Sequence, residues 1–482
     1  MRWRYVLRSI GALIFCLGVT LLLPMAFAAA YRDNSLPALV KTFMIALASG
    51  TGLYVIFRSG HVSVVTHREG MAIVALGWIG AGVVGALPFL FSDTFNSFVD
   101  AFFESVSGFT TTGASVLTDI ERVPRGILMW RSLTHWLGGM GIIVLSLAIL
   151  PFLGVGGMQL YKAEVPGPIP DKLRPRMRDT ALILWRVYFL FTLAETILLM
   201  FGGLDFFDAL CHTFGTMATG GFSTKNASVG HYGSAYVDVV ITVFMLIAGI
   251  NFALHYLALL GNPSAMWRDA EFRFFIGVVL VFILVSALCV YRSVYGSAID
   301  ALRYAAFHVL SIITTTGYAT ANYEQWPPLP QAILLFCMFL GACAGSTGGG
   351  MKCMRIMVLL KHVYLELMHL IHPRSVRHLK LGGRLVPDDI AKSIWSFFIL
   401  YLGLFILSSF LLAAMGVDVV TSFSAVAASI GNIGPGLGEV GPADNYAHLP
   451  DAAKLLLSLC MLLGRLEIYT VIVLFVPEFW RR

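Results

Sequence analysis

Residues 100–113 read DAFFESVSGFTTTG, an apolar, helix-like stretch that ends in three threonines and a glycine. The same form recurs three times, as DALCHTFGTMATGG at 208–221, YAAFHVLSIITTTG at 304–317 and TSFSAVAASIGNIG at 421–434. In every copy the final glycine lies thirteen residues after the first residue of the segment. Each copy is too short and too polar to cross a membrane, which takes about 20 mostly apolar residues. The pattern therefore indicates one structural unit that is used four times.

The composition indicates that the segments around these copies lie in lipid. Of 482 residues, 58% are hydrophobic and only 12% are charged, whereas about a quarter of a soluble domain is charged. Ten stretches are long and apolar enough to span a membrane: 5–30, 37–57, 70–91, 126–152, 181–202, 235–260, 273–292, 330–360, 391–415 and 452–477. At the first, Arg2, Arg4 and Arg8 precede an apolar run; this could be a signal peptide, but its length favours a retained helix.

The distribution of basic residues predicts the orientation of these spans. Lys and Arg gather on the cytoplasmic side of membrane proteins. With the N-terminus inside, the inner segments carry most of the basic residues, including the run from Lys352 to Arg384, and the outer segments carry few. Both termini are then cytoplasmic, and all four repeated segments face outside. The seven cysteines are scattered and form no C-x-x-C pair, which indicates neither a disulfide framework nor a metal site.

The four segments predict a pore. Non-helical backbone is tolerated at membrane depth only where it is buried in protein or lines a watery cavity. Stacked rings of backbone carbonyls can replace the hydration shell of an alkali cation. A single T-T-T-G is more often a helix-capping turn, but four copies on one side, each between two spans, favour a selectivity filter. The predicted cation-binding residues, for which the resemblance given below implies potassium, are Thr111, Thr112, Gly113, Thr219, Gly220, Gly221, Thr315, Thr316, Gly317, Asn432, Ile433 and Gly434.

The loops SGFTTTGA, TGGFST, TTGYAT and NIGPGLG resemble the selectivity filters of the Trk/Ktr/HKT superfamily of cation transporters. The two leading helices and the segments 151–161 and 464–467 narrow the resemblance to bacterial TrkH-like potassium uptake subunits. It covers essentially the whole chain. A glycine at the key position of all four loops implies potassium, whereas a serine in the first would favour sodium. The fourth loop, with Asn432 and Pro435 around its glycine, departs most from the pattern.

These inferences together predict an all-α membrane protein of about ten transmembrane helices. Two leading helices (1–69) precede four helix–pore loop–helix repeats around one pore. The repeats cover 70–152, 181–262, 263–361 and 391–482, with cytoplasmic linkers at 153–180 and 362–390.

A glycine-rich interruption divides the eighth predicted span at Gly341–Lys352. A phosphate loop is excluded by spacing, because Met351 separates the last glycine from the lysine and no Ser or Thr follows. Helix packing through Gly341 and Gly345 remains open, but a flexible intramembrane gate is favoured, and the resemblance implies one here. A charge at membrane depth usually faces protein or water, so Arg465 is predicted to hold this loop. The predicted gate residues are Gly345, Ser346, Thr347, Gly348, Gly349, Gly350 and Arg465.

Polar residues in the repeated segments and in the basic stretch 361–384 are predicted to have supporting roles. Glu104, His212 and His308 occupy equivalent positions in three repeats and are interpreted as orienting or packing groups. The basic stretch 361–384 is interpreted as a solvated or lipid-headgroup face that could also dock a soluble partner. The resemblance implies a homodimer, a cytosolic nucleotide-binding ring partner of the TrkA type, and the bacterial inner membrane. No nucleotide-binding motif, organic cofactor or nucleic-acid partner is predicted for this chain.

Three functional classes remain in competition. A potassium channel-like pore is favoured because the four repeats share one orientation. A proton- or sodium-coupled potassium symporter that works by alternating access is the alternative, and carriers of that class are often built from inverted repeats. A membrane-embedded enzyme would need clustered acidic and histidine residues, and these are scattered here.

Overall fold

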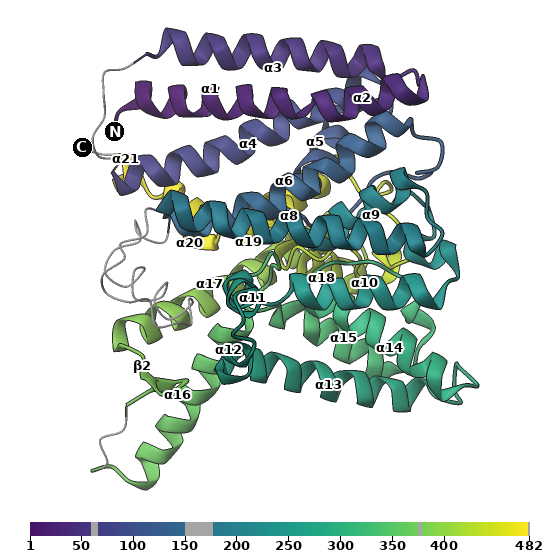
Figure 1. Ribbon diagram of the computed structural model, residues 1–482. Coiled ribbons are helices and arrows are strands. Elements are labelled where there is room, and N and C mark those ends of the chain that lie inside the picture. Colours follow the sequence, from purple (N-terminus) through teal and green to yellow (C-terminus); the bar gives the residue numbers. More distant parts are fainter. Residues whose placement is uncertain (59–65, 150–176, 375–377, 481–482) are drawn as a thin grey trace.

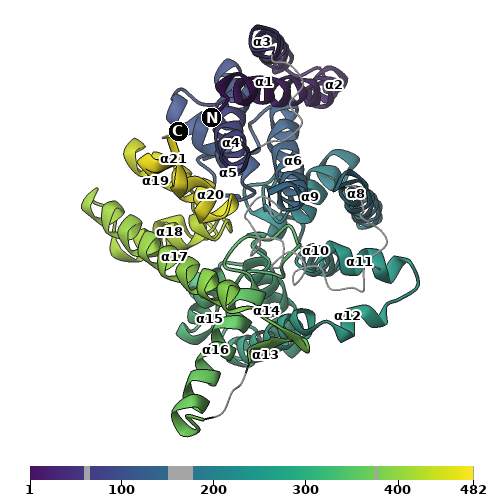
Figure 2. The same cartoon turned by 90° about the vertical axis from the view of Figure 1, so that its left-hand side faces the viewer.

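The computed structural model describes residues 1–58, 66–149, 177–374 and 378–480 (Figure 1). Helices joined by loops make up the described chain, and its one hairpin pairs β1 (Lys380–Leu381) with β2 (Arg384–Leu385). Four units of similar build surround a common centre (Figure 2). The predicted segment 151–161 and most of the linker 153–180 lie outside the described residues.

Each unit contains a long helix, a short helix and a second, often broken, long helix. The first unit comprises α4 (His67–Phe91), α5 (Phe98–Phe109) and α6 (Arg125–Ile149). The second comprises α8 (Met177–Phe201), α9 (Phe206–Met217), α10 (Ala235–Ala248) and α11 (Phe252–Leu259). The third comprises α13 (Ala270–Val290), α14 (Ala298–Ile313), α15 (Pro328–Leu340) and α16 (Cys353–Ile371), preceded by α12 (Ser264–Arg268). The fourth comprises α17 (Asp388–Ala414), α18 (Val419–Ile430), α19 (Asp451–Arg465), α20 (Ile468–Ile472), η5 (Val473–Phe475) and α21 (Pro477–Trp480).

The units are interlocked in sequence order. The second long helix of each unit packs on the short helix of the next, as α6 on α9, α10 on α14 and α15 on α18. The contact of α19 with α5 closes the ring. The four short helices α5, α9, α14 and α18 therefore surround the centre, each between two long helices.

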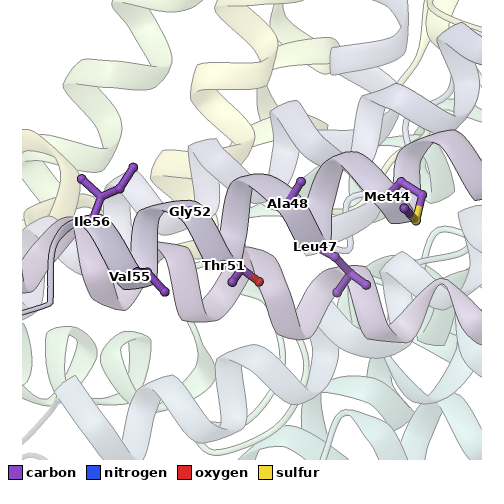
Figure 3. Close-up of a pocket in the computed structure, with 7 residues that line it drawn as sticks. All are labelled: Met44, Leu47, Ala48, Thr51, Gly52, Val55 and Ile56. Atoms are coloured by element: carbon purple, nitrogen blue, oxygen red, sulfur yellow. The ribbon is translucent and has the colours of Figure 1, made fainter.

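Two leading segments pack outside the ring (Figure 2). These are α1 (Trp3–Thr20), continued by α2 (Leu22–Tyr31), and α3 (Leu36–Ile56). Helices α1 and α3 approach closely through glycines, since a Cβ at Gly11 would lie 2.7 Å from the Leu53 Cβ and one at Gly50 would lie 2.6 Å from the Phe15 amide. The opposite side of α3 carries a shallow apolar groove from Met44 to Ile56 (Figure 3).

The apolar helices fit the predicted spans. Within the described residues, six helices are long and apolar enough to cross a membrane, and two bent pairs could add two more spans. The remaining predicted stretches, 126–152 and 330–360, correspond to α6 and to α15 with the start of α16. The chain is thus an all-helical membrane protein, as the sequence predicted.

Two spans predicted as continuous are instead broken. The stretch 235–260 bends by 102° between α10 and α11, and the stretch 452–477 bends by 119° between α19 and α20. Asn251 begins α11 by accepting a hydrogen bond from the Ala253 amide at 2.8 Å. At the second break, Glu467 adopts a left-handed conformation with φ of 57°. Apolar residues lie on both sides of each break, so hydropathy alone indicated one helix.

The predicted cytoplasmic linker 362–390 contains regular structure. Helix α16 continues through Ile371, and the hairpin follows before α17 begins at Asp388. Part of the basic stretch therefore lies on a helix. Figure 1 shows both chain ends on the same side of the molecule as this hairpin.

Candidate functional site

The four short helices end in the same register at the centre of the molecule. Each ends four residues before its predicted filter glycine, at Phe109, Met217, Ile313 and Ile430. The chain then turns through the same hydrogen bond in each copy, from the residue before the glycine to a carbonyl five residues earlier. These N–H···O distances are 2.9 Å for Thr112–Ser107 and 2.8 Å for Gly220–Gly215, Thr316–Ser311 and Ile433–Ala428. The predicted repeat is therefore structural as well as sequential.

The four filter loops meet in a closed ring. A Cβ built on Gly113 would overlap the carbonyl oxygen of Gly220, and one on Gly221 would overlap that of Thr316. One on Gly317 would overlap the Ile433 oxygen. The ring closes where a Cβ on Gly434 would lie 2.7 Å from the Thr112 oxygen. Each glycine thus faces a backbone carbonyl of the next loop, with no room for a side chain.

The backbone of the loops explains why glycine is needed at these positions. The four glycines have φ between 78° and 100°, a region that is costly for residues with a Cβ. The residue two positions earlier is also left-handed in every loop, at Thr111, Thr219, Thr315 and Asn432. The repeated conformation brings all twelve predicted filter residues to one place. The negative ends of four helix dipoles point at this place, which favours a cation.

The fourth loop is chemically distinct. The side-chain Nδ2 of Asn432 donates to the Thr112 hydroxyl at 3.0 Å and to the Met461 carbonyl at 2.9 Å. The Tyr446 hydroxyl donates to the carbonyl oxygen of Gly434 at 2.6 Å. The departure of this loop from the T-x-G pattern is therefore accompanied by contacts to its neighbours.

One polar residue in each short helix ties the helix to the chain that leaves its filter loop. Glu104 accepts from the Val116 amide at 2.9 Å, and His212 Nε2 contacts the Ser223 hydroxyl at 2.9 Å. His308 Nε2 lies 3.0 Å from the Ala321 carbonyl. In the fourth unit the adjacent position, Ser424, makes the equivalent contacts with Leu437, at 2.7 Å and 3.0 Å. These contacts fit the predicted orienting role of Glu104, His212 and His308.

Arg131 is a buried positioning residue that the sequence analysis missed. Its Nε lies 2.6 Å from Glu104 Oε1, and both side chains are buried. Its Nη1 donates to the Ser223 carbonyl at 2.9 Å, and its guanidinium lies 3.5 Å from the centre of the Phe222 ring. Arg131 thus links the first two filter loops. A single arginine within the apolar stretch 126–152 was the available signal.

Lys454 is a second buried positioning residue that the sequence analysis missed. Its ammonium lies 2.6 Å from Asp100 Oδ1, and the lysine side chain is buried. Asp100 is in the first turn of α5, where a carboxylate also interacts favourably with the helix dipole. This pair joins α19 to α5, the contact that closes the ring.

The glycine-rich segment 341–352 lies directly beneath the filter. The Thr347 hydroxyl donates to the carbonyls of Met217, at 3.1 Å, and of Ala248, at 3.2 Å. The Gly349 amide donates to the Thr315 hydroxyl at 2.7 Å. A Cβ on Gly348 would lie 3.1 Å from the Thr314 carbonyl oxygen. The segment thus contacts the base of the second and third filter loops.

The break between α10 and α11 accommodates this segment. The Cys343 amide donates to the Gly249 carbonyl at 3.0 Å, and the Phe252 amide donates to the Gly345 carbonyl at 3.1 Å. Both partners come from interrupted helices, so each break supplies hydrogen bonds that the other lacks. Interrupted helices are tolerated at membrane depth when their freed backbone groups are satisfied in this way.

Arg465 extends from the end of α19 to the same segment. Its Nη1 donates to the Thr347 carbonyl at 2.7 Å, and its Nη2 donates to the Gly138 carbonyl at 3.1 Å. The side chain is only 3% exposed, and no carboxylate among the described residues pairs with it. The predicted contact with the loop is present. Glu467, two residues further, instead pairs with Arg355 of α16.

Comparison with known proteins gives full-length matches. Residues 35–482 match the family model TrkH, described as a cation transport protein. The chain is 46% identical over 485 residues to the Trk system potassium uptake protein TrkH of Salmonella typhimurium, with 100% of both chains covered. It is 45% identical to the protein of that name in Escherichia coli, again with full coverage. The crystal structure of the potassium transporter TrkH from Vibrio parahaemolyticus superimposes with a TM-score of 0.92 at 41% identity, covering 100% of both chains.

Proposed function

This chain belongs to the TrkH family of cation transport proteins, and from that membership we propose that it takes up potassium through a channel-like pore. The four filter loops form the selective part of that pore, and the segment 341–352 forms its gate. Potassium is the transported substrate. The ring in which each filter glycine faces a carbonyl of the next loop is the observation that carries this proposal.

The filter selects potassium through its backbone. Carbonyl oxygens that point at a common axis replace the water around a cation, and the field and spacing of the carbonyls decide which cation is favoured. All four loops carry glycine at the crowded position, so each keeps the left-handed backbone that the ring requires. The four short helices add negative dipole ends around the same axis.

The gate closes the pore below the filter. Residues 345–350 obstruct the pore at this level, and Arg465 holds them there through the Thr347 carbonyl. The guanidinium places a positive charge in the path of a cation, which adds an electrostatic barrier to the steric one. Transport then requires the segment and Arg465 to separate.

The assembly and location follow the family. The protein acts in the bacterial inner membrane with both termini in the cytoplasm, as a homodimer that associates with a cytosolic nucleotide-binding ring of the TrkA type. The basic stretch 361–384, which includes the end of α16 and the hairpin, faces lipid headgroups and that partner. The apolar groove on α3 (Figure 3) contains none of the predicted filter or gate residues.

Rubidium flux into liposomes that contain the purified chain tests this function. A channel-like pore predicts passive uptake down the rubidium gradient, competed by potassium far more than by sodium, without a proton or sodium gradient. Uptake that appears only when a proton or sodium gradient is imposed would instead establish the coupled symporter.

A further inference from the structure

We propose that Glu271 is a positioning residue of the gate, whose carboxylate clasps both ends of the segment 341–352 and keeps it closed. This inference rests on the proposed gate function of that segment. Glu271 lies in the first turn of α13, on a different helix from those that flank the gate, and neither the filter nor Arg465 accounts for it.

One carboxylate oxygen joins the two ends of the segment. Glu271 Oε1 accepts from the Ala344 amide at 2.8 Å and from the Met354 amide at 3.0 Å. Ala344 lies near the start of the interruption, and Met354 lies in the first turn of α16 after it. The Glu271 side chain is 7% exposed, so water has little access to replace these bonds.

The N-terminus of α16 needs this carboxylate. The first amides of a helix have no partner inside the helix, and the N-terminal end of the helix dipole favours a negative charge. The residue at the N-cap of α16, Lys352, provides no side-chain cap. The Glu271 carboxylate supplies from α13 the cap that α16 lacks in its own sequence.

The two ends of the segment lie side by side, with residues 341–342 against residues 350–353, and we call this region the neck. The Cys353 amide donates to the Ala342 carbonyl at 3.0 Å, and a Cβ on Gly350 would lie 2.8 Å from the Gly341 Cα. Glu271 therefore binds at the neck, where the first and last residues of the segment already lie side by side. Arg465 holds the tip of the segment at Thr347, and Glu271 holds its neck, so opening requires both to release.

The chain contains two natural reporters of the neck. Cys343 lies near the start of the segment and Cys353 directly follows its end, and both are free and buried. A closed neck shields these thiols from a membrane-permeant maleimide, and an open neck exposes them. Labelling of each cysteine can be followed by peptide mass spectrometry in the full chain, without removing the other thiols.

The test compares Glu271→Ala with Glu271→Gln in purified, folded protein. Glu271→Ala removes the acceptor of both amides, and we expect maleimide to label Cys343 and Cys353 about tenfold faster than in the wild type. Glu271→Gln keeps a carbonyl oxygen at the same reach but loses the negative charge at the start of α16, so labelling should rise much less than in Glu271→Ala. The matched control is Glu324→Ala, which removes a carboxylate that accepts from a loop amide, that of Gly438, away from the gate.

The outcomes separate the clasp from the gate. Wild-type labelling in Glu271→Ala, or equally fast labelling in Glu271→Gln, would overturn the clasp. Fast labelling in Glu271→Ala together with raised passive rubidium flux supports both assignments. Fast labelling with unchanged flux would keep the clasp and overturn the gate. If Glu271→Ala does not fold, Glu271→Asp takes its place, because the shorter side chain keeps the charge but cannot reach both amides.

Discussion

At the scale of single residues, two ion pairs with buried basic partners hold the short helices around the four loops. Arg131 pairs with Glu104 at 2.6 Å, and Lys454 pairs with Asp100 at the same distance. A buried ion pair does not by itself add much stability, but removal of one partner leaves an uncompensated charge. These residues therefore join the short helices to neighbouring elements and fix the arrangement of the four loops.

The Arg131–Glu104 pair gives the first prediction. Arg131→Met leaves Glu104 charged and buried, and should lower the free energy of unfolding by about 3–5 kcal/mol, measured by thermal unfolding in detergent. Adding Glu104→Gln should restore part of this loss, because the neutral amide keeps an acceptor for the Val116 amide. Equal unfolding of Arg131→Met and the wild type would show that the pair is dispensable.

Tyr446 gives the second prediction. Its hydroxyl bonds the carbonyl of the fourth filter glycine, so Tyr446→Phe frees that oxygen at a net cost of about 0.5–1.5 kcal/mol. We expect a weaker preference for potassium over sodium in competition against rubidium flux. Tyr469→Phe is the matched control, since its hydroxyl donates to the Ser393 carbonyl instead. The same selectivity in both variants would exclude a role for Tyr446 in the filter.

At the scale of elements, three interrupted helices complete one another. The break in α10–α11 and the segment between α15 and α16 exchange backbone hydrogen bonds, and the end of α19 supplies Arg465. None of these breaks would be stable alone, because each leaves backbone groups unpaired at membrane depth. The segment 341–352 is therefore held jointly by three repeats.

Arg465 gives the third prediction. Arg465→Ala removes two hydrogen bonds from a charged donor, and should raise passive rubidium flux by about tenfold. Arg273→Ala, at an exposed position of α13, serves as the control and should leave flux unchanged. Flux at or below the wild-type level in folded Arg465→Ala protein would contradict the proposed closure.

Gly345 gives the fourth prediction. Gly345 has φ of 73°, and a Cβ there would lie 2.8 Å from the side-chain Nδ2 of Asn251. Gly345→Ala should therefore displace the segment and raise passive flux, beyond the backbone cost of about 1–2 kcal/mol for a left-handed alanine. Gly383→Ala pays a similar backbone cost at φ of 83° but meets no atom within 4 Å. A leak in both variants, or in neither, would contradict this packing argument.

At the scale of the whole molecule, the sequence predicted the architecture because the repeat is visible in residue order. Four segments with one offset to a glycine indicated four units, and apolar stretches indicated the helices between them. The breaks after Ala248 and Arg465 were not predicted, because the two helices of each bent pair together are apolar enough to count as one span. The Arg131–Glu104 pair and the Glu271 contacts were not predictable either, because they join residues of different helices and depend on how those helices pack.

Within the candidate site, the residue types were more predictable than their partners. The glycines of the filter were predicted from their position after each short helix, and the structure brings the four loops into one ring. Their binding of potassium stays a prediction. Tyr446 carried no signal, since it lies in an ordinary loop twelve residues after Gly434 and reaches the filter only through the fold.

The most direct test of the central claim is the selectivity of Gly113→Ser in liposomes. A serine Cβ would overlap the Gly220 carbonyl and requires φ of 81°, so the ring must deform at that point. We predict that wild-type rubidium flux is blocked by potassium and poorly by sodium, and that Gly113→Ser largely loses this distinction. Unchanged selectivity in folded Gly113→Ser protein would mean that the glycine ring is not the filter.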